Sequence, residues 1–197
     1  MWLSEKAKTE HAKERFRVSE VQFDEMESIE HTKLKPLTIA MAVSEDYQIL
    51  DVKVGTIPAK GPLSQIAKKK YGSRKNQSDQ MIKDLLKGIR PKLEGKKFRL
   101  KSDAKPQYRR IAKEIFPKQA HEVFIARANK EKRRELKYTN LEKRVFDPLF
   151  ALNQRFAKLR DDIKRLCRRS WCTTKKPENL ELHIYLYMAA NNNMQFI

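Results

Sequence analysis

The sequence predicts a mixed α/β fold, in which helices flank a mixed sheet of five strands. Three strand-like segments follow one another near the N-terminus, and helical segments then alternate with two further strand-like segments. The chain has 197 residues, of which 40% are hydrophobic. This length and composition suffice for one folded domain with a buried core.

Residues 19–57 are expected to form three antiparallel strands joined by short turns. The segment at 19–28 alternates apolar and polar residues, as does the segment at 48–57. The segment at 36–43 is almost continuously apolar, so this strand is expected to be buried on both faces. The preceding residues, 4–17, lack an apolar stripe and are expected to form an exposed helix or a frayed lead-in.

Helices and strands are expected to alternate after this meander. Ser78 is a residue type that caps helices, and apolar residues at helical spacing follow it as far as Ile89. In order, the expected segments are a loop at 55–72, a helix that ends at Pro91, a strand at 96–103, a helix at 105–117 and a strand at 121–127.

The C-terminal part of the chain is expected to be helical. Asp147 and Pro148 favour the start of a long helix, in which apolar residues recur every three or four positions up to Leu166. A last helix is expected at 178–193, with a strand at 181–188 as the alternative. The predicted order, β-β-β-α-β-α-β-α followed by an extra helix, is that of the RNase H-like fold.

The chain is strongly basic, with 44 Lys and Arg residues against 25 Asp and Glu residues and a formal net charge of +19. The excess lies after residue 60, because residues 1–60 hold 9 basic and 11 acidic residues and the remainder holds 35 and 14. Such a balance favours a polyanionic partner, most often nucleic acid, because cationic side chains displace the counterions condensed on phosphates.

Sequence patterns exclude several classes of protein. The chain has no apolar run long enough to span a membrane, its N-terminus lacks the apolar core of a secretory signal, and it has no glycine-rich phosphate loop. Cys167 and Cys172 match neither a disulfide framework nor a zinc site. A cytoplasmic, nucleoid-associated protein without a membrane partner is therefore expected.

Two aspartates are candidate metal ligands. Asp24 lies within the first predicted strand, where carboxylates are rare unless they are paired or bind a metal, and Asp103 ends the fourth. Ligands lie past the carboxyl ends of strands in open sheets, so the two carboxylates should meet if these strands are neighbours. Such a pair suits Mg²⁺ (or Mn²⁺), and two such ions can promote a phosphodiester displacement. The alternatives are an exposed edge acid for Asp24 and a helix N-cap for Asp103.

Five segments of the sequence resemble those of an insertion-sequence transposase. They are, in order, QFDEMES, KPLTIAMAV, ILDVKVG, RLKSDAKPQY and FDPLFALNQRFAKLRDDIKRLCRRSW. This family belongs to the DDE group of the RNase H-like (retroviral integrase) superfamily, and the resemblance covers roughly residues 19–193. It implies metal-dependent cleavage and transfer of DNA strands at transposon ends, by a homo-oligomer assembled on DNA.

The resemblance places Asp24 and Asp103 at the positions of the family's first two metal ligands. It implies Asn153 as the third, because many relatives have a glutamate there and some have an asparagine; Asp147 and Glu142 are the alternatives. Basic residues are expected to contact DNA phosphates, since arginine forks match phosphate oxygens. They are Lys130, Lys132, Arg133, Arg134, Arg160, Arg165, Arg168 and Arg169.

The expected organisation is a helical lead-in at 1–18, a catalytic domain at 19–170 and a helical extension at 171–197. Relatives carry an N-terminal module that recognises transposon ends, and the lead-in has no counterpart to it, so the chain is not expected to act autonomously. Two other functions fit the same residues. One is a structure-specific nuclease of the same fold, such as a ribonuclease H or a junction resolvase, and the other is a basic remnant that binds DNA without cutting it.

Overall fold

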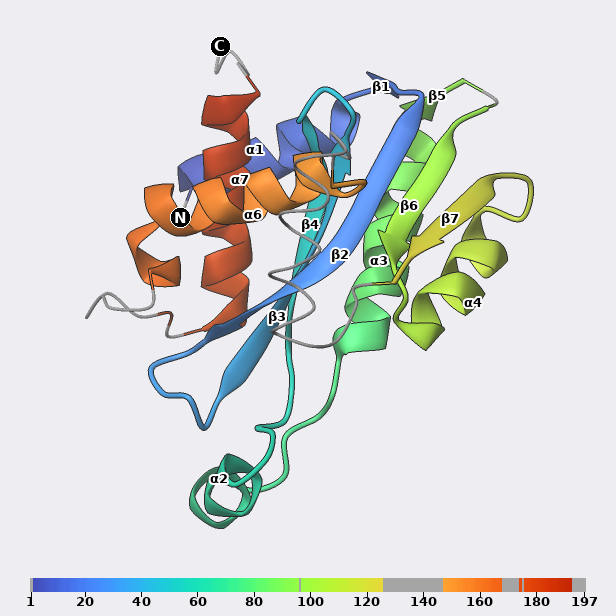
Figure 1. Cartoon of the computed structure of the whole chain (residues 1–197). Helices are drawn as coiled ribbons and strands as arrows, with labels where there is room; N and C mark the ends of the chain where they lie inside the picture. Colours follow the sequence, from blue (N-terminus) through green and yellow to red (C-terminus); the bar gives the residue numbers. More distant parts are fainter. Residues whose placement is uncertain (1, 96, 126–146, 168–173, 175, 193–197) are drawn as a thin grey trace, which may run out of the picture.

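A computed structural model of the chain describes residues 2–95, 97–125, 147–167, 174 and 176–192 (Figure 1). In this part of the chain it has a five-stranded mixed sheet, a two-stranded sheet and six α-helices. The expected mixed α/β class is therefore confirmed. No helix in the described residues is both long and apolar enough to cross a membrane.

The large sheet contains the five strands that the sequence predicts. Three of them form an antiparallel meander, and the two later strands extend the sheet in parallel with the first. Across the sheet, the strands are β4 (Ile49–Thr56), β3 (Pro36–Ser44), β2 (Glu20–Ile29), β6 (Arg99–Asp103) and β7 (Ala120–Phe124). Only β3 runs in the direction opposite to the other four.

The neighbouring strands β2 and β6 pair over a short stretch only. Residues 20–22 of β2 pair with residues 99–101 of β6, and β2 then continues as far as Ile29 with β3 as its partner. The carboxyl ends of these two parallel strands therefore separate. In open sheets, such a point is where ligands bind.

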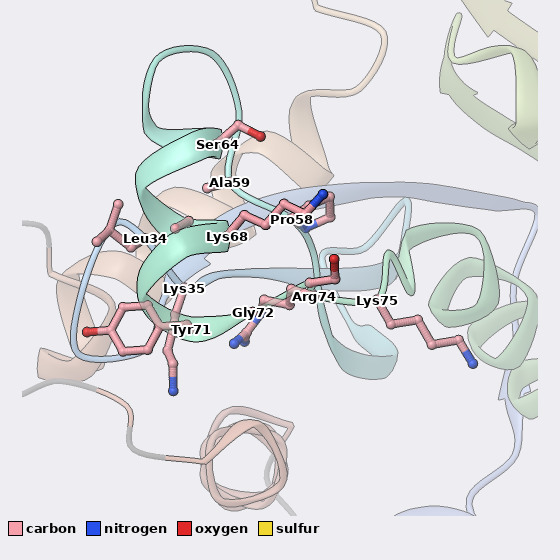
Figure 2. A pocket seen from close by; sticks show the side chains of 12 residues that line it. Leu34, Lys35, Pro58, Ala59, Ser64, Lys68, Tyr71, Gly72, Arg74 and Lys75 are labelled. Atoms are coloured by element: carbon pink, nitrogen blue, oxygen red, sulfur yellow. The ribbon is translucent and has the colours of Figure 1, made fainter.

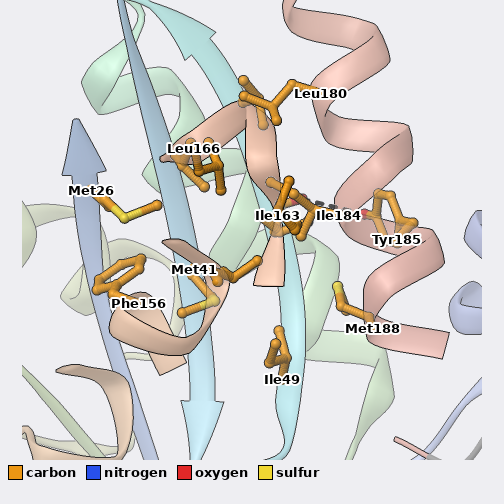
Figure 3. Close-up of a cluster of buried hydrophobic side chains, with 14 of the residues drawn as sticks. Met26, Met41, Ile49, Phe156, Ile163, Leu166, Leu180, Ile184, Tyr185 and Met188 are labelled. Carbon is orange, nitrogen blue, oxygen red and sulfur yellow. Dashed lines mark hydrogen bonds between the residues drawn. The ribbon is translucent and has the colours of Figure 1, made fainter. Parts of the chain in front are cut away.

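Helices cover both faces of the large sheet (Figure 1). One face packs against α3 (Ser78–Ile89) and α4 (Pro106–Ile115), and the other against α6 (Phe150–Asp162), α7 (Pro177–Asn191) and α1 (Trp2–Lys13). Met41 of β3 points into the core under α6 and α7 (Figure 3), whereas the adjacent Ala40 and Ala42 belong to the other core. The prediction that this strand is buried on both faces is confirmed.

One helix lies where the sequence predicts a loop. The helix α2 (Leu63–Tyr71) occupies half of the segment 55–72 and projects away from the sheet (Figure 1). Gly72 ends it with a φ of 76°, a left-handed value that glycine adopts without strain. Ala67 is the only buried residue of α2. The apolar residues at helical spacing with it, Leu63, Ile66 and Tyr71, are exposed, so this short apolar pattern is not buried against the sheet.

The C-terminal helices differ from expectation in their limits. The expected long helix starts at Phe150 instead of the Asp147-Pro148 pair, and it ends at Asp162 before a 3₁₀ turn, η2 (Lys164–Leu166). The last helix, α7, is confirmed, and the alternative strand at 181–188 is wrong.

The N-terminal segment is helical, as one of the two alternatives predicts, but it is not a frayed lead-in. Its residues Ala7 and His11 are buried, and His11 Nε2 donates a hydrogen bond of 2.8 Å to the carbonyl oxygen of Leu50 in β4. A short parallel pair, β1 (Phe16–Arg17) with β5 (Leu93–Glu94), follows. A 3₁₀ turn, η1 (Arg90–Lys92), connects α3 to β5.

Candidate active site

A pocket of about 400 Å³ lies where β2 and β6 separate, and we call it the carboxylate pocket. Acidic side chains from both strands line it together with side chains at the starts of α3 and α4. The residues that carry the argument below are Asp24, Glu25, Ser78, Asp103, Lys105 and Tyr108. The predicted meeting of Asp24, in the middle of β2, with Asp103, at the end of the neighbouring β6, therefore occurs.

Asp24 and Glu25 reach the same pocket although they are consecutive residues of a strand. Successive strand residues point to opposite faces of a sheet, and Phe23 and Met26 do lie in different cores. At this point β2 has lost β6 as its neighbour, so both carboxylates face the open gap. The hydroxyl of Tyr108 donates to both, at 3.0 Å to Asp24 Oδ1 and 2.9 Å to Glu25 Oε2.

Asp103 ends β6 and directs the chain into α4. Its Oδ1 accepts a hydrogen bond of 3.0 Å from the backbone N–H of Lys105, the residue before the helix. The alternative role of Asp103 as the helix N-cap is wrong, because Lys105 occupies that position and no side chain caps α4. The hydrogen bond from the Lys105 backbone is compatible with metal binding, because a carboxylate has two oxygens and about four acceptor positions.

The charges of Asp24 and Asp103 are close enough to affect each other. The pKa of Asp24 is raised to about 6, chiefly by burial and then by the negative charges of Asp103 and Glu25, although hydrogen bonds from the Glu25 backbone N–H and from Tyr108 lower it. A bound cation would relieve this repulsion. Asp24 and Asp103 thus form an acidic pair in a pocket that Lys60 and Lys105 also line.

Glu25 is held by side chains from β3, from α3 and from the start of α4. Burial alone would raise its pKa, but hydrogen bonds and the positive charge of Lys105 lower the pKa below its usual value, so the carboxylate is ionised. Lys105 Nζ forms an ion pair with Glu25 Oε2, the hydroxyl of Ser78 donates to the same oxygen at 2.9 Å, and that of Thr38 donates to Oε1 at 2.8 Å. Both oxygens of Glu25 already have donors, so the carboxylate holds Lys105, Ser78 and Thr38 in place around the pocket. We therefore do not count Glu25 among the candidate metal ligands.

The helix-capping role predicted for Ser78 is wrong. Ser78 is the first residue of α3, the residue before it is Gln77, and no side chain caps the helix there. The hydroxyl of Ser78 points to Glu25 instead. Glu25 and Lys105 received no role from sequence patterns, and the only sequence signals for them were their positions next to Asp24 and shortly after Asp103.

Tyr108 remains a hydrogen-bond donor to the pocket. Burial raises its pKa strongly, and the negative charges of Asp24 and Glu25 add to the increase. Its ring packs against Phe23 at 5.4 Å between centroids, which fixes the position of its hydroxyl. Tyr108 therefore sets the orientation of the Asp24 carboxylate without changing its own protonation.

The structure does not bring the expected third ligand to this pocket. Asn153 is exposed on α6, and its Nδ2 donates a hydrogen bond of 2.7 Å to Asp147 Oδ2. The residues that line the carboxylate pocket include neither of them. The remaining alternative, Glu142, lies outside the described residues.

Two carboxylates fit a hydrated divalent cation. Mg²⁺ keeps several waters and commonly binds through one or two carboxylates together with phosphate oxygens of a substrate. Asp24 and Asp103 supply hard oxygen donors of this kind. Within the described part of the chain, however, no group of three or more His, Cys, Asp or Glu residues is arranged to hold a metal ion.

Part of the expected DNA-contacting set lies beside the carboxylate pocket. Arg160 and Arg165 line a neighbouring pocket of about 570 Å³, and Pro58 and Lys60 line both pockets. The other expected contacts fall outside the described residues; they are Lys130, Lys132, Arg133, Arg134, Arg168 and Arg169. Two arginines are thus placed where a polyanion in the carboxylate pocket would extend.

No model of a known protein family matches this chain, and no curated protein matches it. Interpretation of the carboxylate pocket therefore rests on its geometry, its charges and the fold around it.

Proposed function

We propose that this chain is the catalytic domain of a DDE-type transposase, which cuts and joins DNA strands with the help of divalent cations. One observation carries the proposal. Asp24 on the central strand β2 and Asp103 at the carboxyl end of the adjacent parallel strand β6 line a single pocket.

The arrangement of strands supports this proposal. The order β4-β3-β2-β6-β7, with only β3 antiparallel to the rest, is the arrangement expected of the RNase H-like fold. In such a sheet the central strand and the first crossover strand end at the same crevice, and the proposed ligands lie on these two strands.

The chemistry assigns a different task to each group in the pocket. Asp24 and Asp103 would hold Mg²⁺ or Mn²⁺, as two ions in the complete site, and Tyr108 would keep the Asp24 carboxylate in position. The bound cations would neutralise charge on the scissile phosphate and favour in-line attack by water or a 3′-hydroxyl group. Arg160 and Arg165, in the adjoining pocket, would hold flanking phosphates.

The proposal depends on the two aspartates alone. Asn153, Asp147 and Glu142 stay predictions for the third ligand, because Asn153 and Asp147 bond to each other away from the pocket and Glu142 is not among the described residues. The same observation favours a second candidate function, that of a basic DNA-binding remnant that no longer cuts. Both functions include DNA binding, but only the transposase would cleave DNA.

Cleavage of supercoiled plasmid and of linear duplexes tests the proposal. With Mg²⁺ or Mn²⁺, the chain should nick DNA, and Asp24→Asn or Asp103→Asn should lower the rate by on the order of 100-fold or more, since a lost ligand removes several kcal/mol of charge stabilisation. The exposed Asp46, in the turn after β3, provides the control Asp46→Asn, which should cut at the rate of the unaltered chain.

Other outcomes of the cleavage assay would contradict the proposal or favour a different function. Full activity in Asp24→Asn would overturn the assignment of the site. Cleavage of RNA–DNA hybrids or junctions without joining of ends would favour a structure-specific nuclease, and DNA binding without cleavage in either metal would favour the remnant.

A further inference from the structure

The connection between β4 and α3 is an unusually basic projection. It comprises residues 57–77, which we call the basic arm, and it contains α2. Six of its residues are basic and none is acidic. The basic residues are Lys60, Lys68, Lys69, Lys70, Arg74 and Lys75. Figure 1 shows the arm standing away from the two layers of helices.

The basic arm is fixed to the sheet at its base. The backbone N–H of Thr56 donates to Gln77 Oε1 at 2.8 Å, and the backbone N–H of Gln77 donates to the Thr56 carbonyl at 2.9 Å. Further along, Arg74 forms an ion pair with the buried Glu30 at the end of β2. Lys35 Nζ lies 4.8 Å from the ring centre of Tyr71. These contacts fix the position of the arm relative to the sheet. The lysines of the arm that are exposed therefore lie at defined places on the surface.

A pocket of about 410 Å³ opens beside α2, and we call it the arm pocket (Figure 2). Lys35, Lys68, Arg74 and Lys75 line it, and no acidic side chain among the described residues does. Lys35 and Arg74 both pair with Glu30. The side chains of Lys68 and Lys75 form no ion pair within the described residues and are exposed, so two full positive charges remain for a ligand.

The arm pocket and the candidate active site share one lining residue. Pro58, at the base of the arm, lines the arm pocket, the pocket that contains Arg160 and Arg165, and the carboxylate pocket. In Figure 2 the side chain of Lys68 extends toward Pro58. A linear polyanion that passes Pro58 would therefore meet lysines on one side and Asp24 and Asp103 on the other.

We propose that the basic arm binds the sugar–phosphate backbone of duplex DNA through Lys68 and Lys75 and leads it to the carboxylate pocket. This inference rests on the proposed function, because it assigns DNA as the polyanion. The lysine ammonium group is a compact charge on a flexible side chain, and it can pair with phosphate oxygens. Such contacts with phosphates do not distinguish one base sequence from another. Single strands are usually bound on exposed aromatic platforms. The arm has one aromatic residue, Tyr71, which is 38% exposed and whose ring already contacts Lys35 and His31. A single ring provides no series of stacking positions, which favours duplex over single strands.

The test measures binding without cleavage. Fluorescence anisotropy with a short labelled duplex, in EDTA and between about 50 and 200 mM salt, gives the affinity and its salt dependence. The variant Lys68→Gln/Lys75→Gln should bind about 10-fold more weakly at the lower salt concentration. Its slope of log K against log salt should be smaller by about 2, because two phosphate contacts are lost.

A matched control separates the arm from charge in general. Lys87→Gln/Lys118→Gln removes the same charge from exposed positions outside the three pockets, and it should bind nearly as the unaltered chain does. Circular dichroism and thermal unfolding confirm that both double variants fold. Equal loss in the control pair, unchanged binding in the arm pair, or no duplex affinity in the unaltered chain would each overturn the inference. So would tighter arm-dependent binding to single strands or to anionic vesicles than to the duplex.

Failure of this inference is distinguishable from failure of the proposed function. Asp24→Asn leaves the arm intact, so in EDTA the arm substitutions should weaken duplex binding by the same factor in the Asp24→Asn background as in the unaltered chain. Arm-dependent binding without any nicking would support the arm and contradict the proposed function. Nicking that depends on Asp24 but is unchanged in the arm variant, together with unchanged binding, would contradict the arm alone.

Discussion

The buried position of Asp24 disfavours the negative charge of its carboxylate. Its pKa rises from an ordinary value of 3.8 to about 6, chiefly because burial disfavours the ionised form and then because Asp103 is nearby. The folded chain therefore binds this proton more tightly than the unfolded chain does. Folding stability falls as pH increases from about 4 to about 6 and stays lowered above that range. A cation between the aspartates would remove this cost.

Replacing Asp24 by Asn should therefore stabilise the metal-free chain at pH 7.5. The gain in the free energy of unfolding should be up to about 3 kcal/mol, since one pKa unit corresponds to about 1.4 kcal/mol, and it should vanish below about pH 4, where the aspartate is protonated in both states. Urea unfolding at several pH values measures it, with Asp46→Asn as the exposed control. Equal stability of Asp24→Asn and the unaltered chain at pH 7.5 would contradict this account.

Helix α3 and strand β4 approach each other so closely that one position requires glycine. A Cβ atom on Gly88 of α3 would lie 2.7 Å from Asp51 Oδ2 in β4. Asp51 is only 2% exposed and accepts a hydrogen bond of 2.6 Å from the hydroxyl of Tyr185 in α7. Its carboxylate also lies 3.6 Å from Lys92 Nζ. Because Asp51 is held in this way, it cannot move aside at little cost.

The substitution Gly88→Ala should thus destabilise the chain by about 1–3 kcal/mol, as overpacking does. Helix propensity alone would give the opposite sign, because alanine is favoured over glycine by up to about 1 kcal/mol in a helix interior. Thermal or urea unfolding distinguishes the two. The neighbouring exposed Lys87→Ala should change stability by less than about 0.5 kcal/mol. A more stable Gly88→Ala variant would show that α3 and β4 are less tightly packed than described.

Across the whole molecule, the N-terminal segment joins both hydrophobic cores. Ala7 of α1 belongs to the core under α6 and α7, and Phe16 of β1 belongs to the core under α3 and α4. An ion pair of 2.7 Å between Lys8 and Glu181 links α1 to α7. The sequence predicts that residues 1–18 form a lead-in separate from the domain that follows. These contacts predict instead that residues 1–18 unfold together with that domain.

Deleting residues 1–18 should lower the melting temperature by about 10 °C or more. Truncation of a buried Phe to Ala typically costs about 3–5 kcal/mol, and in a protein of this size one kcal/mol corresponds to about 2–4 °C. Calorimetry of the full-length and shortened chains measures the difference. Lys13→Ala, which removes only an exposed ion pair with Glu10, should leave the melting temperature nearly unchanged. An unchanged melting temperature after the deletion would favour an independent lead-in.

Local patterns determined most of the regular structure. The alternation of β2, the continuous apolar run of β3 and the apolar spacing of α3 each report how one element is buried, and an element's own residues carry that information. The meeting of Asp24 and Asp103 was also predictable, since Asp103 ends one strand and Asp24 lies near the middle of the longer strand expected beside it. The helix α2 was not, because its flanking glycines indicate a loop and its surface is polar on most sides.

The sequence by itself thus determined the mixed α/β fold, the excess of positive charge and the two aspartates of the carboxylate pocket. Only the tertiary structure decided that Ser78 and Lys105 hold Glu25, that Asn153 lies away from the pocket, and that the arm pocket adjoins it. The physical reason is distance along the chain. A pattern reports which face of an element is buried, but contacts between side chains dozens of residues apart depend on how whole elements pack against one another.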